Sequence, residues 1–111
     1  MFSDKILEQA YAELGSAEAA RSSGFEGRAR VSARRAAGIV ARSYLEGLGL
    51  PVGTSSAYDV LQILRDRAEI ANEIRQVIDH LLMRVDRDFQ IPTQVDLIAE
   101  TRWLIQNLDK D

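Results

Sequence analysis

The chain contains one pair of side chains whose types and spacing could support a reaction. Arg75 precedes His80 by five residues, and His80 is the only histidine in the sequence. Imidazole exchanges protons near neutral pH, whereas guanidinium holds a phosphate through two hydrogen bonds and stabilises the charge that develops on it. The pair could therefore cleave the phosphodiester backbone of RNA without a metal ion. The imidazole would move the proton of the ribose 2′-hydroxyl or of the leaving oxygen.

The spacing does not direct these two side chains to one point on a single helix. At ~100° per residue, five residues separate them by about 140° around a straight helix. A catalytic interpretation therefore requires a second subunit packed against the same face. In the alternative interpretation His80 is a surface histidine and Arg75 forms salt bridges, because acidic residues such as Glu73 and Asp79 lie near them in the sequence.

The pair lies in the stretch 68–88, which has the pattern of an amphipathic helix. His80 falls on its polar side and Arg75 borders the apolar side. An earlier helix is expected to begin at Ser55 or Ser56. It either continues into this stretch as one helix of some thirty residues or forms a separate segment that meets it near residue 67, and the length of a single helix favours two segments. The predicted buried residues of this region are Val60, Leu61, Leu64, Ala71, Ile74, Ile78, Leu81, Leu82 and Val85.

The N-terminal part predicts a helix, a short helical piece and a loop. Apolar residues recur at helical spacing from Phe2 to Leu14, and Gly15 is expected to end this helix. Ser16 would then begin a short piece that runs to about residue 22. Residues 22–27 contain two glycines and are expected to form a loop, in which Phe25 covers the end of the core.

Two further helices complete the prediction. The segment Arg28–Leu48 has a helical apolar stripe, and Gly38 within it should let another helix approach closely. The last helix is expected to follow Pro92 and Thr93. No segment alternates with the period of a strand. We therefore expect an all-α fold, in which residues 1–111 form a single antiparallel four-helix bundle with short additional helical segments.

Three arginines form a regular row on the second of the long helices. Arg28, Arg35 and Arg42 lie seven residues apart, so they share one helical face. Such a row could bind the phosphates of a nucleic acid. The alternative is a solvated face paired with acidic neighbours, since the chain has a net charge of −3 and no aromatic residues interleave the row.

Trp103 lies off the apolar stripe of the last predicted helix. A large aromatic side chain in such a position marks a surface for a partner, and tryptophan is favoured at the centres of interfaces. Trp103 is therefore a candidate for a subunit interface. The alternative is that the last helix is buried on more than one side.

The amino-acid composition indicates which classes of protein and of site to expect. The 111 residues are 46% apolar and 28% charged, as in ordinary globular proteins. The chain has no cysteine and one histidine, so we expect no disulfide and no metal site. The predicted core accounts for the apolar residues, so none remains to bind a cofactor. No apolar run approaches the roughly 18 residues that cross a membrane, and the first residues do not form a signal peptide. A cytoplasmic protein is expected.

Three strings in this order, SARRAAGIVARSYLEGLGLP, SAYDVLQIL and RQVIDH, resemble the HEPN family over residues 33–108. The resemblance implies a four-helix bundle, usually homodimeric, in which Arg75 and His80 of both subunits cut RNA at the dimer interface without metal. It also implies a nucleotidyltransferase or an antitoxin as a partner. Active members place Asn, Asp or His after the arginine, where this chain has Gln76. Two functions stay open: a homodimeric ribonuclease and a non-catalytic dimeric protein-interaction module.

Overall fold

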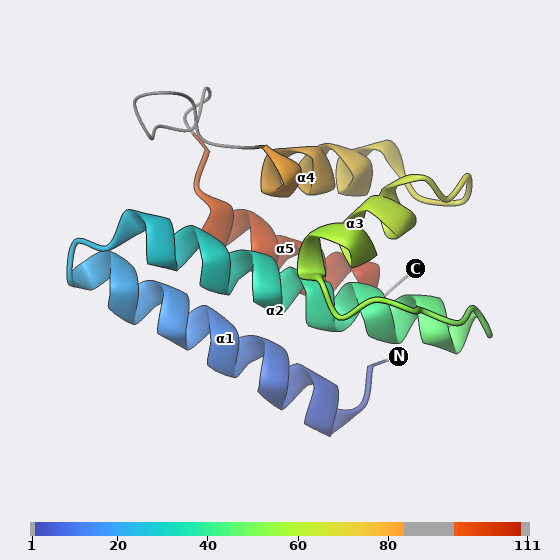
Figure 1. The fold of residues 1–111 in the computed structure, drawn as a ribbon, viewed down its shortest axis with the longest axis horizontal. Coiled ribbons are helices and arrows are strands. Elements are labelled where there is room, and N and C mark those ends of the chain that lie inside the picture. Colours follow the sequence, from blue (N-terminus) through green and yellow to red (C-terminus); the bar gives the residue numbers. More distant parts are fainter. Residues whose placement is uncertain (1, 84–94, 110–111) are drawn as a thin grey trace.

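The computed structural model describes residues 2–83 and 95–109, which form five α-helices and no strand (Figure 1). The helices are α1 (Asp4–Ser22), α2 (Glu26–Gly47), α3 (Ala57–Arg65), α4 (Asn72–Leu82) and α5 (Leu97–Leu108). The predicted all-α class is therefore confirmed for the described part of the chain.

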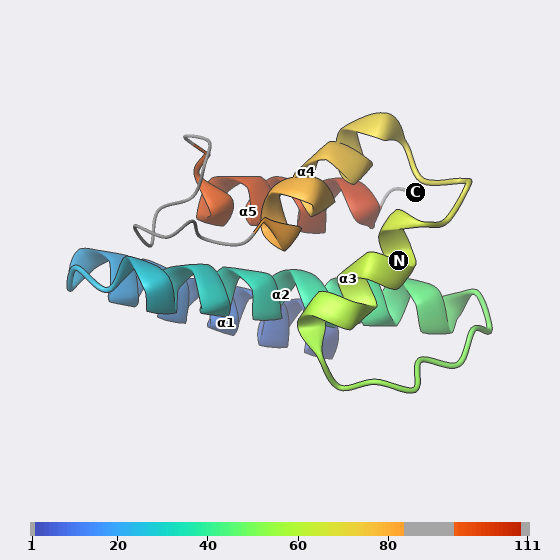
Figure 2. The ribbon, with the colours of Figure 1, turned by 45° about the horizontal axis from the view of Figure 1, so that its top comes forward.

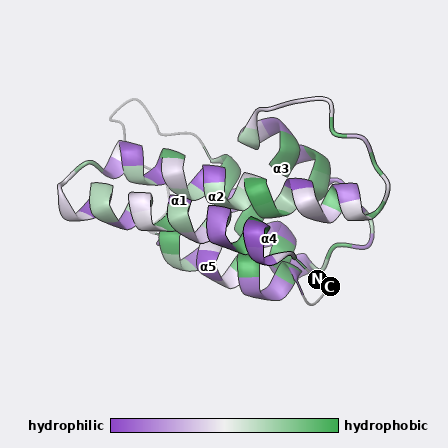
Figure 3. Ribbon diagram, turned by 90° about the horizontal axis from the view of Figure 1, so that it is seen from below, coloured by the Kyte–Doolittle hydropathy of each residue, from purple (hydrophilic) through white to green (hydrophobic). Residues whose placement is uncertain are grey.

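The helices are stacked around one hydrophobic core. α1 and α2 lie side by side, and α5 packs against both of them, whereas α4 packs on α5 and α3 (Figures 1 and 2). α3 crosses from the layer of α1 and α2 toward the layer of α4 and α5 (Figure 2). The buried apolar side chains of the five helices form one cluster. Hydrophobic and hydrophilic residues alternate along the helical ribbons (Figure 3).

The first helix is longer than its sequence predicts. α1 continues through Gly15 to Ser22, so the predicted end at Gly15 and the separate piece beginning at Ser16 are wrong. The buried stripe continues at helical spacing on both sides of Gly15, through Ala10, Leu14 and Ala17. A single helical glycine costs about 1 kcal/mol relative to alanine. Burial of this stripe against α2 and α5 offsets that cost.

The connection between α1 and α2 is tighter than predicted. It consists of residues 23–25, in which Gly24 adopts a φ of 83° that glycine reaches without steric penalty. Phe25 is 53% exposed, so the prediction that it covers the end of the core is wrong. The buried residues near this connection include the small side chains of Ala17, Ala20, Ala29 and Ala33, and small side chains allow two helices to approach closely. The ring of Phe25 instead lies beside the guanidinium of Arg28.

Two local predictions around α3 are confirmed. The Cβ of an alanine at position 38 would lie 2.8 Å from the Cβ of Ala57, so Gly38 is required by the close crossing of α2 and α3. Ser56 begins α3, and its hydroxyl oxygen accepts a hydrogen bond from the backbone N–H of Asp59 at 3.2 Å.

The region after Ala57 forms two helices, as predicted. α3 ends at Arg65 and α4 begins at Asn72, so residues 66–71 are not helical. The helix in the amphipathic stretch therefore begins at Asn72, and not at residue 68 as expected from the sequence. Ile70 is buried within this break and anchors it to the core. α5 begins after Asp96, whereas Val85, Pro92 and Thr93 lie outside the described residues.

Candidate functional site

Arg75 lies on the side of α4 that faces α3, and its guanidinium binds backbone. Its Nε donates to the carbonyl oxygen of Arg65 at 3.1 Å, and Nη2 donates to that of Arg67 at 2.9 Å. Its Nη1 donates to the side-chain oxygen of Asn72 at 3.0 Å. The last carbonyls of a helix lack partners within the helix, so Arg75 supplies donors at the end of α3 and holds the connection to α4 in place.

A second arginine strengthens the contact between α3 and α4. Arg65 binds the carboxylate of Asp79 through Nε, and its Nη2 lies 3.4 Å from Asp79 Oδ2. The hydrogen bond to Asp79 is the main cause that raises the pKa of Arg65 above its usual value. Asp79, which the sequence places one residue before the histidine, is therefore part of the contact with α3.

His80 lies on the other side of α4 and contacts α5. Its Nδ1 is 2.7 Å from Oε1 and 3.0 Å from Oε2 of Glu100. The two side chains are only 18% and 25% exposed. An ionised carboxylate only accepts hydrogen bonds, so Nδ1 is the donor and Nε2 is the ring nitrogen that remains for other partners. A carboxylate that holds an imidazole in this way also orients it in known general-base sites.

Within one chain the structure does not bring Arg75 and His80 to a common point. Arg75 binds the end of α3, and His80 binds α5. This separation agrees with their angular offset along the helix. It also means that each of the two side chains has a partner inside its own chain.

The predicted arginine row lines a groove along α2. The main part of the groove has a volume of about 620 Å³ and lies between α1, α2 and the start of α3. A second depression of about 560 Å³ continues it toward the start of α2, and the two share Glu13, Val31 and Arg35. Arg35 and Arg42 line the first part, and Arg28 and Arg35 line the second. The three arginines therefore face one continuous surface.

The arginines of this groove differ in what they contact. Arg42 donates to the carbonyl oxygens of Val52 and Thr54, which attaches the loop before α3 to α2. The guanidinium of Arg28 lies over the ring of Phe25, with 5.0 Å between its central carbon and the ring centroid. Arg35 is exposed and has no hydrogen bond or ion pair with any residue in 2–83 or 95–109. Of the three, Arg35 is the one most available to a ligand.

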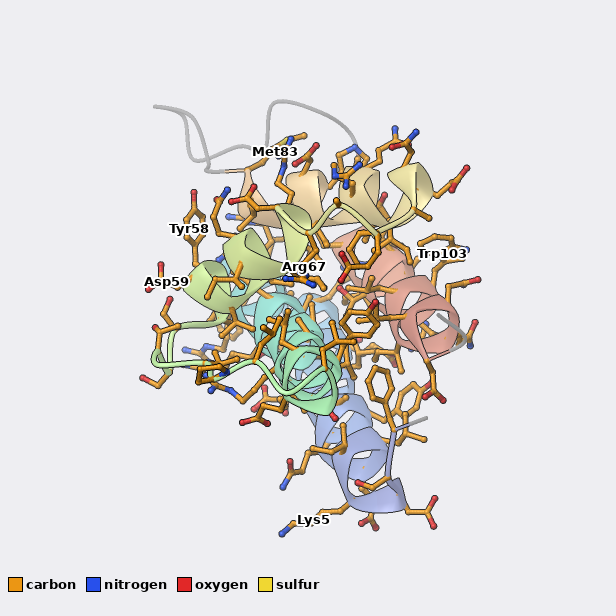
Figure 4. The ribbon with its side chains drawn as sticks, turned by 90° about the vertical axis from the view of Figure 1, so that its right-hand side faces the viewer. Lys5, Tyr58, Asp59, Arg67, Met83 and Trp103 are labelled. Atoms are coloured by element: carbon orange, nitrogen blue, oxygen red, sulfur yellow. The ribbon has the colours of Figure 1, made fainter. Side chains whose placement is uncertain are left out.

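Trp103 lies on the outer face of α5. Its side chain is 36% exposed, and Figure 4 shows it projecting away from the core on the side opposite Tyr58, which lines the groove. The predicted position off the apolar stripe is confirmed. Its role at a subunit interface stays a prediction.

Two contributors to these sites were missed by the sequence reasoning. Glu100 lies 20 residues after His80, and no local pattern connects the two. Ile6 of α1 lines the groove, although its spacing only predicted a buried position. Both assignments depend on which helices become neighbours.

The described residues form neither a metal site nor a membrane span. Within residues 2–83 and 95–109, no three His, Asp or Glu side chains gather as a metal site would require. None of the helices in the same ranges is both long enough and apolar enough to cross a membrane. The groove and the α3–α4–α5 contacts are the features that carry the functional argument.

Comparisons of this chain with protein-family models, with curated proteins and with solved structures gave no match.

Proposed function

We propose that this chain is a non-catalytic protein-interaction module with a HEPN-like four-helix bundle. α1, α2 and α5 would take three positions of the bundle, and the short helices α3 and α4 together would take the fourth. The module would act as a homodimer, with Trp103 on the outer face of α5 as the candidate contact between subunits.

The groove along α2 is the observation that carries this proposal. Its volume of about 620 Å³ lies within the range of ligand-binding clefts. Its floor includes apolar side chains, and Val31 among them is 41% exposed. An apolar surface that stays open beside arginine side chains is typical of a site for a partner.

The contacts of Arg75 argue against catalysis. Three of the five N–H donors of Arg75 are already used, by the carbonyls of Arg65 and Arg67 and by Asn72, so a phosphate clamp that used the Nε and Nη2 edge would require it to give up hydrogen bonds. Each such bond contributes about 0.5–1.5 kcal/mol, and the released carbonyls at the end of α3 would need new partners. Its present contacts make Arg75 a structural residue of the α3–α4 connection.

A second candidate is the homodimeric, metal-independent ribonuclease. The hydrogen bond between His80 Nδ1 and Glu100 supports it, because this bond orients the ring and leaves Nε2 for proton transfer. In this alternative His80 is the acid or base and Arg75 is the phosphate clamp. Arg28, Arg35 and Arg42 would then contact RNA.

Incubation of a mixed RNA pool with the purified protein in EDTA separates the two candidates. We expect no cleavage, or traces that are equal for the wild-type protein and for His80→Ala. The matched control is Gln76→Ala, which changes an exposed residue of the same helix. Cleavage that is lost in His80→Ala and kept in Gln76→Ala would overturn the non-catalytic proposal.

Sedimentation velocity tests the proposed dimer. The wild-type protein should sediment as a dimer, and Trp103→Ala should shift it toward the monomer. The control is Phe25→Ala, which removes another exposed aromatic ring, in the connection between α1 and α2. A wild-type monomer would rule out the homodimer.

A further inference from the structure

We propose that the groove along α2 binds an amphipathic helix with acidic flanks, supplied by a different protein. The inference rests on the proposed function, because it names the class of partner that the interaction module recognises. Four features carry it: the length of the groove, its floor, the sign of its charge and the availability of Arg35.

The groove has the dimensions of a helix-binding site. On α2 it extends from Gly27 to Glu46, which is about 28 Å at 1.5 Å per residue. Ile6 and Ser16 mark the two ends of its wall on α1. A helix of about 19 residues would match this length. Two helices that lie side by side with a furrow between them provide the geometry of helix-in-groove recognition.

The floor of the groove supplies an apolar stripe. Val31 and Ile39 lie two turns apart on α2, and Ile6 faces the groove from α1. Ile6 and Ile39 are only partly buried, and Val31 is exposed. An amphipathic helix would cover these side chains with its own apolar residues, which recur every three or four positions.

The charge of the groove selects an acidic partner. Its lining contains Arg28, Arg34, Arg35 and Arg42 against the glutamates Glu13 and Glu46. The groove is thus positive although the chain as a whole has a net charge of −3. Arg35 lines both parts of the groove without a partner in the described residues. Carboxylates beside the apolar stripe of a partner helix would therefore meet this guanidinium.

A nucleic acid fits the same surface less well. Phosphates gain affinity from cationic side chains, but they gain nothing from a floor that contains Val31, Ile39 and Ile6. Single-stranded RNA would need aromatic platforms on which its bases stack, and among the described residues that line the groove Tyr58 is the one aromatic side chain. The combination of apolar floor and arginines favours a helix over RNA.

Three designed peptides test the proposal on the full chain. Each is a fluorescein-labelled helix of about 18 residues with the same leucine stripe, and the flanks of the stripe are Glu, Gln or Lys. Fluorescence anisotropy should give the tightest binding for the Glu peptide, about tenfold tighter than for the Lys peptide. Arg35→Glu should remove this preference, and Val31→Glu should weaken all three peptides.

Arg30→Glu is the matched control. It makes the same charge change on the same helix at a position that does not line the groove, so the preference for the Glu peptide should persist. Circular dichroism checks that each variant remains helical. Equal binding of the three peptides, no binding of any of them, or equal effects of Arg35→Glu and Arg30→Glu would overturn the proposal.

Two further measurements identify a different occupant. The first is the binding of labelled single-stranded RNA in EDTA. If the wild-type protein binds this RNA, Arg35→Glu abolishes the binding and no preference for the Glu peptide is found, the groove is assigned to nucleic acid. A dimer that Arg35→Glu dissociates in sedimentation would assign it to a second copy of this chain. Either result overturns the acidic helix. Failure of the peptides by itself leaves the proposed interaction module in place, whereas RNA cleavage that depends on His80, or RNA binding in the groove, removes it.

Discussion

His80 Nδ1 and Glu100 Oε1 lie 2.7 Å apart and join α4 to α5. Both side chains are mostly buried, so the bond is made where water competes poorly for its partners. It fixes the orientation of the only histidine of the chain and links two helices that pack on each other.

Removal of the Glu100 carboxylate should destabilise the fold. Glu100→Ala would leave Nδ1 of His80 without its partner in a largely buried position, and we expect a loss of about 1–2 kcal/mol in the free energy of unfolding. Urea denaturation followed by circular dichroism measures this. Glu73→Ala is the control, because Glu73 is an exposed glutamate on α4, the helix of His80, and should change stability by less than about 0.5 kcal/mol. Equal stabilities of the two variants would show that the bond contributes nothing.

Arg75 should matter for stability whether or not the protein has an activity. Arg75→Ala removes donors to the carbonyls of Arg65 and Arg67, so we expect a loss of about 1–3 kcal/mol. Arg67→Ala is the control, since it deletes a surface ion pair with Glu69 and should cost at most about 1 kcal/mol. If Arg75→Ala unfolds at the same urea concentration as the wild-type protein, the structural role of Arg75 is contradicted.

Two glycine substitutions should change stability in opposite directions. Gly38→Ala places a Cβ 2.8 Å from the Cβ of Ala57 and should destabilise the fold by about 1–3 kcal/mol as α2 and α3 are pushed apart. Gly15→Ala meets open space in the middle of α1 and should stabilise it by about 0.5–1 kcal/mol. Thermal unfolding of both variants tests this. Stabilisation by both would mean that α2 and α3 do not cross so closely.

The ion pair between Arg21 and Asp96 should make stability depend on acid pH. Arg21 Nη1 lies 2.8 Å from Asp96 Oδ1, and this hydrogen bond is the largest cause that lowers the pKa of Asp96. A carboxyl with a lowered pKa contributes stability above its unfolded pKa of about 3.9 and loses it as the pH falls through the folded value.

Asp96→Asn should isolate this contribution. Asparagine also caps the start of a helix, so the variant should keep α5 and lose up to about 1 kcal/mol at pH 7. The difference from the wild-type protein should begin to shrink below about pH 3.9, where the carboxyl of the unfolded chain takes up a proton, and should be lost as the pH falls through the lower pKa of the folded state. Urea unfolding between pH 3 and 7 measures it. A difference that stays constant over this range would exclude the ion pair as its cause.

Local sequence rules predicted the parts of the fold that depend on neighbours along the chain. The spacing of apolar residues gave the all-α class, and Ser56 marked the start of α3. Gly38 marked a close crossing because a helical glycine requires a packing reason. The angular offset of Arg75 and His80 followed from the pitch of a helix alone, whatever surrounded it.

Other predictions were wrong because packing against other helices outweighed the local preference of the sequence. Gly15 is a weak stop signal, and the burial of Leu14 and Ala17 on both sides of it outweighed the signal. Phe25 was expected to cover the core, but its ring is exposed and lies beside the guanidinium of Arg28. These outcomes required knowledge of which surfaces meet.

The sequence by itself determined a helical chain, the candidate pair of Arg75 and His80, and one arginine row, because each follows from residue type and helical period. Only the tertiary structure decided what these residues contact. It tied Arg75 to the end of α3, joined His80 to Glu100 and placed Ile6 and Arg35 along one groove. Such contacts join residues that are distant in sequence, and they arise because packing of the apolar faces selects which helices become neighbours.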